Sequence, residues 1–436
     1  MTDQHKYDGR VRCRVLILGG GFGGLYTALG LERLLRPEDR TEVTLVNPDN
    51  FSLFTPMLCE VAGSSIDTRH AINPIRRMLR RTRFVEGEAI SLDPQTRTVL
   101  VRHPGEHTHR YSYDHLVVAV GARTGFFGMR DVQEHALTAK TLGDAVLVRN
   151  RVIEMLEMAV IEDDPARRAA LLTFVVGGGG FTGVEIAGEI NELVRQAARA
   201  YPTIQQEEVR IILLEAMPRL MPEMDEKLAS FALERLRAAG VEVRLNTRVS
   251  GASAEEVRIK DGESVPSRTL VWTSGVAPHP FVAESPLPKD GRGWVTVDAH
   301  LRVPGFPGVW ALGDCAGVPD ILHPGHNHPA MAQHAIREAD QLAHNIVAAI
   351  RGARTRPFRY RTRGYMATIG HFNGVGLIGP FRVWGFLAWC LWRTYYLWRL
   401  PRLEKRLRVA MDWTLDLWFG RDISVIQTVT ASGRYQ

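Results

Sequence analysis

Short apolar runs alternate with longer stretches of helical spacing along most of the chain. "RVLIL" (14–18) ends in four apolar residues, and the segment from Phe22 to Leu35 after it has the spacing of a helix. Apolar runs without alternation are typical of strands buried on both faces of a parallel sheet. Similar runs recur as "EVTLVN" (42–47), "HLVVAVGAR" (115–123), "TFVV" (173–176) and "VRIILLEAM" (209–217). The pattern predicts an α/β protein with parallel sheets.

Two glycine-rich turns each follow one of these strands and open a helix. The G-x-G-x-x-G spacing is filled by Gly19, Gly21 and Gly24 and again by Gly178, Gly180 and Gly183. The first glycine allows a tight turn, the second lets backbone approach a pyrophosphate, and the third lets the helix pack on the strand. One such turn is weak evidence, but two in strand–turn–helix context predict two Rossmann-like dinucleotide sites. Two dinucleotides on one chain indicate FAD in one site and NAD(P) in the other.

The end of the second strand in such a unit usually holds an acid that binds ribose hydroxyls. In the first unit that place holds Asn47, with Asp49 two residues later, and asparagine still hydrogen-bonds a hydroxyl. In the second unit it holds Glu215, whose carboxylate would bind the adenosine ribose and repel a 2′-phosphate. The sequence therefore predicts a preference for NADH over NADPH. A solvated glutamate at a strand end is the alternative, since its spacing from the glycines is longer than usual.

Length and composition limit the class of protein. A chain of 436 residues with 45% hydrophobic content is expected to form two or three domains. The net charge of +6 is too mild to indicate a nucleic-acid partner. The four cysteines lie far apart, which argues against a disulfide framework, a zinc knuckle or a dithiol redox centre. No signal-peptide segment and no transmembrane helix are expected.

The order of the patterns indicates that the second dinucleotide unit is inserted into the first. "GVWALGDCAG" (308–317) has the pattern of a strand and glycine turn that return to the first unit, and Asp314 follows that glycine. A helix is predicted next, over 329–350. We therefore expect a split domain of residues 10–125 and 285–350, an inserted domain of residues 126–284, and a C-terminal region of residues 351–436.

The C-terminal region differs in composition from the rest of the chain. Six of the nine tryptophans lie between residues 382 and 422, interleaved with arginines and lysines, and this mixture is typical of a membrane surface. The apolar run from Val383 to Trp392 ends at Arg393 and is too short to span a bilayer. A docked helix pair or a dimer interface is the alternative. The residues expected at the headgroups are Trp384, Trp389, Trp392, Trp398, Arg402, Lys405, Arg406 and Arg408.

The chain resembles the type II NADH:quinone oxidoreductases, single-subunit respiratory flavoenzymes that do not pump protons. The motifs behind the resemblance are "GGGFGG", "LFTPMLCEVAG" (53–63), "VVAVGA", "GGGGFTGVE", "LGDCA" and "AMAQHA" (330–335), together with the aromatic and basic tail. The resemblance implies tightly bound FAD in the split domain and NADH on the inserted domain, with two electrons passing from NADH through the flavin to a membrane quinone. It also implies a homodimer held peripherally at the cytoplasmic face of the cell membrane.

The resemblance also assigns site residues motif by motif. Those implied for FAD are Gly19, Gly21, Phe22, Gly23, Gly24, Asn47, Phe54, Thr55, Pro56, Ala89, Gly121 and Asp314. Those implied for NADH are Gly178, Gly180, Phe181, Thr182, Gly183, Glu215 and Gly275. Those implied for the quinone are Ala332, Gln333, Ile336, Tyr365 and Ile369.

Glu185 and Gln333 are the candidate catalytic residues. Glu185 is expected in the first turn of its helix, where a carboxylate would compensate the helix dipole by ~0.3–1 kcal/mol. The resemblance instead implies that Glu185 lies beside the nicotinamide and the flavin and aids proton delivery, and both interpretations stay open. The amide of Gln333 is expected to hydrogen-bond a quinone carbonyl.

Two other functions fit the same patterns. A sulfide:quinone oxidoreductase shares the fold and a membrane tail but needs reactive cysteines near the flavin, and Cys59 and Cys315 have no obvious partner in sequence. A redox-sensing flavoprotein that binds NADH and turns over slowly is the second. No metal is expected at the histidines of "HPGHNHP" (323–329), because acidic and cysteine ligands are absent from this segment.

Overall fold

The computed structural model describes residues 11–260 and 262–426. The chain packs into two compact units. Unit 1 comprises Met1–Ser52, Asn73–Arg123 and Ala277–Thr362, and unit 2 comprises Leu53–Ile72, Thr124–Val276 and Arg363–Gln436. The predicted domain ranges, 10–125 with 285–350, 126–284 and 351–436, stay a prediction, because a division by packing does not say which cofactor each part binds.

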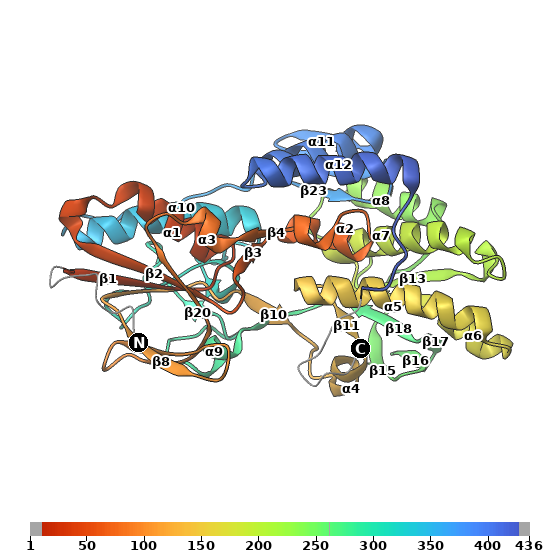
Figure 1. Cartoon of the computed structure of the whole chain (residues 1–436), viewed down its shortest axis with the longest axis horizontal. Helices are drawn as coiled ribbons and strands as arrows, with labels where there is room; N and C mark the ends of the chain where they lie inside the picture. Colours follow the sequence, from red (N-terminus) through yellow and green to blue (C-terminus); the bar gives the residue numbers. More distant parts are fainter. Residues whose placement is uncertain (1–10, 261, 427–436) are drawn as a thin grey trace. The chain divides into compact units, whose positions relative to one another are not determined.

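A five-stranded parallel sheet forms the centre of unit 1 (Figure 1). Its strands, in spatial order, are β21 (Val309–Ala311), β9 (His115–Val118), β1 (Cys13–Leu18), β2 (Thr41–Asn47) and β5 (Arg83–Glu86). The helices α1 (Phe22–Leu34) and α10 (Ala332–Ile350) pack against each other in this unit. Gly30 permits their close approach, because a Cβ there would lie 2.7 Å from the Cβ of Ala343.

Shorter elements complete unit 1. An antiparallel sheet contains β6 (Glu88–Asp93), β7 (Thr98–Arg102) and β8 (Thr108–Ser112). Further short elements include α3 (Ile75–Met78), α9 (Pro280–Glu284), β20 (Val295–Thr296) and β22 (Ala316–Gly317).

Unit 2 repeats the parallel-sheet plan around a second glycine turn. Its strands, in spatial order, are β11 (Leu137–Thr138), β18 (Thr269–Trp272), β12 (Thr173–Gly177), β13 (Arg210–Leu214) and β14 (Val241–Arg244). The helices of this part are α2 (Leu58–Ala62), α4 (Arg130–His135), α5 (Leu142–Ile161), α6 (Pro165–Leu171), α7 (Phe181–Ala197) and α8 (Glu226–Ala238). A small antiparallel sheet contains β15 (Val249–Ala252), β16 (Glu256–Ile259) and β17 (Ser264–Pro266).

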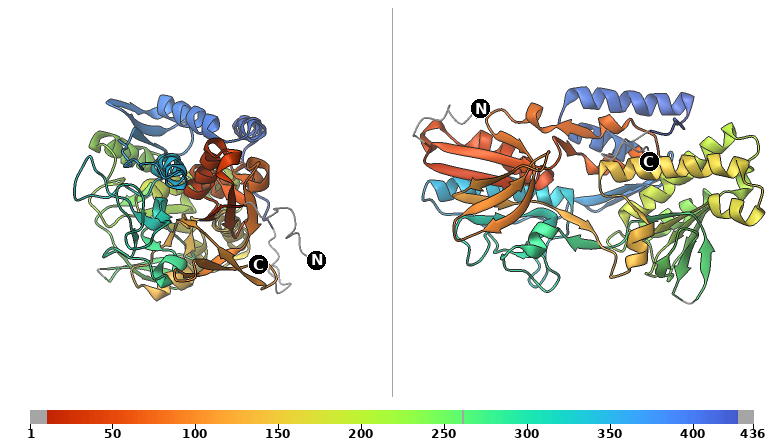
Figure 2. Two further views of the ribbon diagram at one scale, coloured as in Figure 1. Left: turned by 90° about the vertical axis from the view of Figure 1, so that its left-hand side faces the viewer. Right: turned by 60° about the horizontal axis from the view of Figure 1, so that its bottom comes forward.

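The C-terminal residues pack into unit 2. They form an antiparallel sheet of β23 (Gly364–Thr368), β24 (Gly374–Ile378) and β25 (Phe381–Trp384), and then the helices α11 (Gly385–Arg399) and α12 (Leu403–Phe419). The two helices lie side by side (Figures 1 and 2), and β24 contacts α8 and α11. Among the described residues, no helix is long and apolar enough to cross a bilayer.

The predicted α/β class with two Rossmann-like parallel-sheet units is confirmed. The strand predicted over 115–123 is interrupted after Val118 and resumes as β10 (Ala122–Thr124). The reason is Gly121, whose φ of +71° turns the chain in a conformation that strand residues do not adopt. The helix predicted over 329–350 begins only at Ala332.

Candidate functional site

The first glycine turn of unit 1 is shaped to receive an anion. A Cβ on Gly24 would lie 1.9 Å from the carbonyl oxygen of Gly19, so only glycine lets α1 pack this close to β1. At Gly21, by contrast, a Cβ would meet nothing within 4 Å. Gly21 is also the N-cap of α1, with no side-chain cap and no acidic residue in the first turn. The amides at this helix start therefore face open space and fit a pyrophosphate.

The turn of unit 2 repeats this geometry. A Cβ on Gly183 would lie 1.7 Å from the carbonyl oxygen of Gly178, while a Cβ on Gly180 would meet nothing within 4 Å. Gly180 is the N-cap of α7 and carries no side-chain cap. Gly178 has φ of +117°, a value open to glycine but strained for other residues. The residues of both turns fit a dinucleotide on the same physical grounds.

Asn47 and Glu215 occupy matching places beside the two turns. Asn47 Oδ1 accepts a hydrogen bond of 2.7 Å from the amide of Gly20, and Asn47 Nδ2 donates to the carbonyl oxygen of Asp49 at 2.7 Å. Glu215 accepts from the amide of Gly179 and, at 2.7 Å, from the amide of Met217. The two side chains thus fix the glycine turns, in addition to the ribose contacts that the resemblance implies.

The remaining residues implied for FAD fall in both units. Unit 1 contains Phe22, Ala89, Gly121 and Asp314, and unit 2 contains Phe54, Thr55 and Pro56. The φ of +71° at Gly121 leaves open space where a side chain would project. Phe54 is buried and meets the ring of Tyr396 edge-on at 6.1 Å.

Sequence reasoning missed Glu338 in unit 1. This α10 residue is 2% exposed, and its Oε2 accepts a hydrogen bond of 2.7 Å from the amide of Gly313, the neighbour of Asp314. Burial raises the pKa of Glu338 to about 7. A buried carboxyl in this place holds the turn that carries Asp314. In the sequence, Glu338 is one of several polar residues of an amphipathic helix, so the apolar periodicity does not distinguish it from solvent-exposed residues.

Gln333 and the other quinone candidates of unit 1 lie at the start of α10. Ala332, Gln333 and Ile336 are half-buried there. The hydroxyl of Tyr360 donates to Gln333 Oε1 at 3.1 Å, which holds the amide in one orientation. Tyr360 is a further residue of this site that the sequence did not single out.

The unit 2 candidates gather around the start of α7. The rings of Phe181 and Tyr365 stack at 5.7 Å, so a predicted NADH residue and a predicted quinone residue are neighbours. Thr182 is exposed and Ile369 is buried. Gly275 has φ of +78°, and a Cβ there would lie 2.5 Å from the carbonyl oxygen of Gly125. Gly275 is therefore required by its backbone as well as by any approach of the nicotinamide.

Glu185 lies deeper in α7 than the sequence indicates. The helix begins at Phe181, so Glu185 is in its second turn, where little of the dipole effect remains. The predicted first-turn position is wrong, because the helix begins directly after its N-cap Gly180. Glu185 Oε1 accepts from the amide of Thr368 at 3.1 Å, and Oε2 lies 3.8 Å from the Cys59 sulfur. Burial raises the Glu185 pKa to about 8, so this carboxyl holds a proton at neutral pH.

The cysteines near the predicted flavin segments, Cys59 and Cys315, are buried thiols. Cys13, Cys59, Cys315 and Cys390 are all free. Burial raises the pKa of Cys59 well above its ordinary value and raises that of Cys315 to about 12. A thiolate is the form that attacks sulfur, so both groups are poorly suited to sulfide chemistry.

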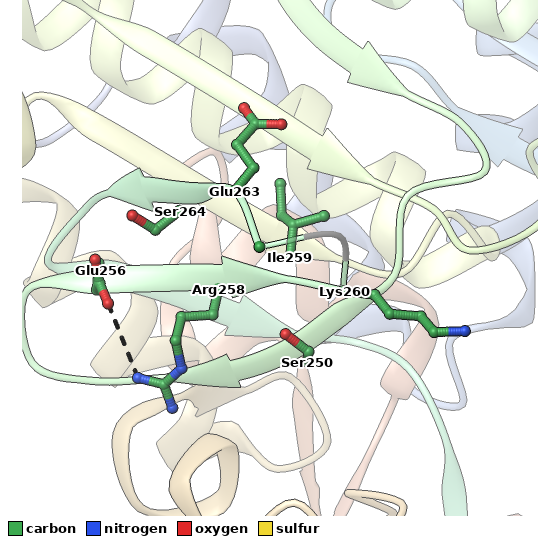
Figure 3. A pocket seen from close by; sticks show the side chains of 8 residues that line it. Ser250, Glu256, Arg258, Ile259, Lys260, Glu263 and Ser264 are labelled. Carbon is green, nitrogen blue, oxygen red and sulfur yellow. Dashed lines mark ion pairs between the residues drawn. The ribbon is translucent and has the colours of Figure 1, made fainter.

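A pocket lies on the small sheet of unit 2 (Figure 3), and none of the predicted site residues lines it. Ser250, Glu256, Arg258, Lys260 and Glu263 are among the side chains that line it. Arg258 forms ion pairs with Asp131 and, at 3.9 Å, with Glu256. Glu256, Arg258 and Glu263 are already in ion pairs, which does not favour a further ligand.

In the C-terminal region, the structure contradicts part of the predicted set of membrane-contacting residues. Trp384 and Trp398 are exposed as predicted, but Trp389 and Trp392 are only 8% and 1% exposed because they pack inside unit 2. Lys405 is also buried, and its Nζ donates to the carbonyl oxygen of Arg69 at 2.6 Å, so it is not available to a phosphate. Arg402 and Arg408 are partly neutralised by Glu404, at 3.1 Å and 3.3 Å.

The fold and the paired glycine turns define a class of nucleotide-dependent oxidoreductases. Residues 13–339 match the family described as pyridine nucleotide-disulphide oxidoreductase. The structure of NDH2 from Plasmodium falciparum in complex with NADH superposes with a TM-score of 0.87 at 21% identity, covering 95% of this chain and 100% of that one. The shared architecture therefore extends over the C-terminal region as well as the two sheets.

Two curated relatives narrow the class. The chain is 35% identical over 419 residues to a type II NADH:quinone oxidoreductase of Mycobacterium tuberculosis, covering 93% of this chain and 88% of that protein. It is 33% identical over 419 residues to a probable NADH dehydrogenase of Dictyostelium discoideum, covering 94% and 91%. The chain belongs to the type II NADH:quinone oxidoreductase family, and the resemblance inferred from its motifs is confirmed.

Proposed function

We propose that this protein is an NADH:quinone oxidoreductase that binds FAD in unit 1 and NADH in unit 2. The observation that carries the proposal is the pair of glycine turns, each with an open position at its second glycine and an uncapped helix start. When bound, the flavin accepts hydride from the nicotinamide and transfers two electrons to the quinone. The protein positions the reactants and supplies the proton that the reduced quinone takes up.

Individual residues then have definite tasks. The amides after Gly21 and Gly180 bind the two pyrophosphates, and Asn47 and Glu215 fix the turns and bind ribose hydroxyls. Gln333 hydrogen-bonds a quinone carbonyl, with its amide oriented by Tyr360. Glu185 holds a proton at neutral pH and is the donor to the reduced quinone. No role for a metal follows from these residues.

The quinone is apolar, so we propose that α11 and α12 bind the protein to a membrane surface. One face of α12 is exposed and apolar along its whole length, and its residues are Leu403, Leu407, Met411, Leu415 and Trp418. The opposite face carries the buried Val409 and Trp413. Such a stripe suits burial at the headgroup boundary, with Arg406 and Arg408 near anionic phosphates. Attachment at the cytoplasmic face and a homodimer complete the proposal.

One assay tests the central reaction. The purified protein should oxidise NADH slowly alone and rapidly with a soluble quinone, and the flavin that it releases on denaturation should be FAD. NADH binding without quinone-dependent turnover would favour the redox-sensing alternative. Quinone reduction by sulfide in place of NADH would favour the sulfide alternative, which the buried thiols oppose. Light scattering in detergent measures whether the protein is a dimer.

A further inference from the structure

Three carboxyl groups line one face of α7. Glu185, Glu189 and Glu192 are spaced i, i+4 and i+7, so neighbouring members of the row lie about 5–6 Å apart at their Cβ atoms. At a rise of about 1.5 Å per residue the whole row spans about 10 Å. Glu185 and Glu192 are half-buried, while Glu189 between them is 6% exposed. The row therefore runs from one accessible position, through the interior, to another.

Each member of the row is held by a neighbour on a different element. Glu185 Oε1 accepts from the amide of Thr368 in β23. Glu192 Oε1 lies 3.5 Å from the amide of His371, in the turn after that strand. Glu189 forms an ion pair of 2.8 Å with Arg421, whose side chain is 2% exposed and also donates to the carbonyl oxygen of Gly63. The row is thus fixed in place along its length.

Further buried charges surround the middle of the row. Glu60 of α2 accepts from the indole of Trp413 at 3.0 Å and lies 3.9 Å from Arg393, which stacks over Trp389 and Trp413. Asp416 of α12 lies 3.8 Å from Arg421 Nε. Neither carboxylate oxygen of Asp416 has a hydrogen-bond partner, and neither does Glu60 Oε2, although these atoms are buried. Buried polar atoms of this kind usually bind water, which is what a proton path needs.

The charge count of this cluster leaves protons on it. Arg393 and Arg421 supply two positive charges, against four carboxyl groups, those of Glu60, Glu185, Glu189 and Asp416. These four carboxyl groups, three of them on buried residues and one on the half-buried Glu185, cannot all ionise beside two cations without a large desolvation cost. Burial accordingly raises the pKa of Glu60 and of Glu185 to about 8, and raises that of Glu189 as well. Cys59, Tyr396 and His371 also face this cluster, and burial disfavours the charged form of each.

The proposed reaction needs one proton from water in each turnover. NADH supplies two electrons and one proton as hydride, whereas a quinol contains two electrons and two protons more than the quinone. The balance is NADH + H⁺ + quinone → NAD⁺ + quinol. A reduction site that excludes water needs a route for the second proton.

We propose that Glu192, Glu189 and Glu185 form a proton-uptake path along α7 that delivers this proton to the quinone. Glu192 takes up the proton from water at the half-buried end, Glu189 transfers it through the interior, and Glu185 donates it. Side-chain rotation and bridging water cover the 5–6 Å between neighbours. Arg421 offsets part of the rise in the Glu189 pKa, because the guanidinium favours the ionised carboxylate, and so helps Glu189 to pass the proton on. The path rests on the proposed function, since it serves quinone reduction.

The test separates the two half-reactions of the full-length flavoprotein by anaerobic stopped flow. Glu189→Gln should slow reoxidation of the reduced flavin by a soluble quinone by roughly 100-fold, the lower end of what a positioned proton-transfer group contributes. Glu192→Gln should slow it less, since water reaches that end of the path. Reduction of the flavin by NADH should be unchanged in both. The solvent deuterium isotope effect on reoxidation should rise, and Glu189→Asp should restore part of the rate.

A matched control is Glu154→Gln, which changes a half-buried glutamate of α5 outside the row and should leave both half-reactions unchanged. If Glu189→Gln does not fold, Glu192→Gln decides the question. Wild-type reoxidation rates and isotope effects in the folded variants would overturn the path, and so would equal slowing of both half-reactions. Failure of the wild-type protein to reduce quinone with NADH would instead overturn the proposed function.

Discussion

Asn47 and Glu215 lie at equivalent positions of the two units, at the end of the second strand, but differ in charge. Each accepts a hydrogen bond from the second amide of a glycine turn, Gly20 in one unit and Gly179 in the other. An amide oxygen is sufficient for this structural task, which explains how asparagine can stand where an acid is usual. Only Glu215 adds a negative charge that would repel a 2′-phosphate.

Glu215→Gln should therefore narrow the preference for NADH over NADPH, although it loses the hydrogen bond that the second carboxylate oxygen accepts from the amide of Met217. The glutamine oxygen still accepts from Gly179, but the repulsion is lost, and a change of about tenfold in the ratio of kcat/KM corresponds to about 1.4 kcal/mol. Steady-state kinetics with both cofactors measure it. Glu242→Gln, at an exposed ion pair with Arg210 in the neighbouring strand, is the control and should leave the ratio unchanged. Equal use of both cofactors by the wild type would contradict the assignment.

Glu60 should make the stability of the protein depend on pH. Burial raises its pKa from 4.5 to about 8, so between these values the folded chain keeps a proton that the unfolded chain has lost. The free energy of unfolding then falls as pH rises, by up to about 1.4 kcal/mol per pH unit for one group, and levels off above the folded pKa. Glu60→Gln cannot ionise, so its unfolding midpoint should vary less between pH 5.5 and 8. Denaturant unfolding across this range measures the slope, and the exposed Glu134→Gln should retain the wild-type slope.

At the scale of elements, the two strand–turn–helix segments have the same geometry, and each is expected to bind one dinucleotide. In each segment the third glycine allows the helix to contact the turn, and the second leaves space at the helix start. The two requirements are physically distinct, because one concerns packing and the other concerns a ligand. Substitutions at the two positions should therefore have different effects.

Gly21→Ala should leave the fold intact and reduce flavin content. Its φ of −76° suits alanine, and the added methyl group enters open space that the pyrophosphate would fill. Gly24→Ala should destabilise unit 1, because its Cβ would overlap the carbonyl oxygen of Gly19. Flavin absorbance per protein and thermal unfolding separate the two effects. If Gly21→Ala kept its full flavin content, the pyrophosphate would have to bind somewhere other than at Gly21.

Residues at the start of α10 are expected to affect the reaction with quinone but not the reduction of the flavin by NADH. Gln333→Ala removes the amide that would bind a quinone carbonyl, and the loss of one good hydrogen bond corresponds to roughly tenfold in reoxidation rate. Flavin reduction by NADH should stay near the wild-type rate. Stopped-flow traces of the two half-reactions measure both effects, and Tyr360→Phe should have a smaller effect of the same kind. Equal slowing of both half-reactions would point to a general loss of flavin placement instead.

At the scale of the whole molecule, the C-terminal region is both a surface and part of a core. Its described residues from Arg363 onward belong to unit 2. The segment after α12 contacts α5, where the side chain of Arg149 donates to the carbonyl oxygens of Asp422 and Ser424. Removal of residues after Thr355 would therefore expose the core of unit 2. Point changes on the exposed stripe of α12 are a cleaner probe of membrane binding.

Leu407→Glu with Met411→Glu should abolish binding to anionic vesicles while flavin content and soluble-quinone activity are retained. Both side chains are 62% exposed, so their loss removes an apolar contribution to binding without changing the interior. High salt should release the wild type only in part, because apolar burial is not screened, and detergent should release it fully. Vesicle flotation measures the bound fraction. Ile161→Glu, at an exposed apolar residue of α5 outside the stripe, is the control, and a wild type that does not bind vesicles would contradict the membrane proposal.

The sequence by itself determined the features that depend on neighbours along the chain. Buried strands, the glycine turns after them and Glu215 at a strand end follow from local backbone geometry and from the period of apolar residues. The α/β class, the two nucleotide-binding units and the family were therefore predictable. Element ends shifted by a few residues, and Glu185 lies in the second turn of its helix, because helix starts depend on tertiary packing.

Only the tertiary structure decided which polar residues meet in the interior. The cluster joins Glu60, Glu189, Arg393 and Arg421, which are separated by up to hundreds of positions, so no spacing rule could assemble it. It also decided which face of α11 is buried: the helix has aromatic residues all around, so periodicity could not distinguish the buried Trp392 from the exposed Trp398. Burial, and with it the raised pKa of Glu185, arises from packing between distant segments, and a linear pattern does not contain that information.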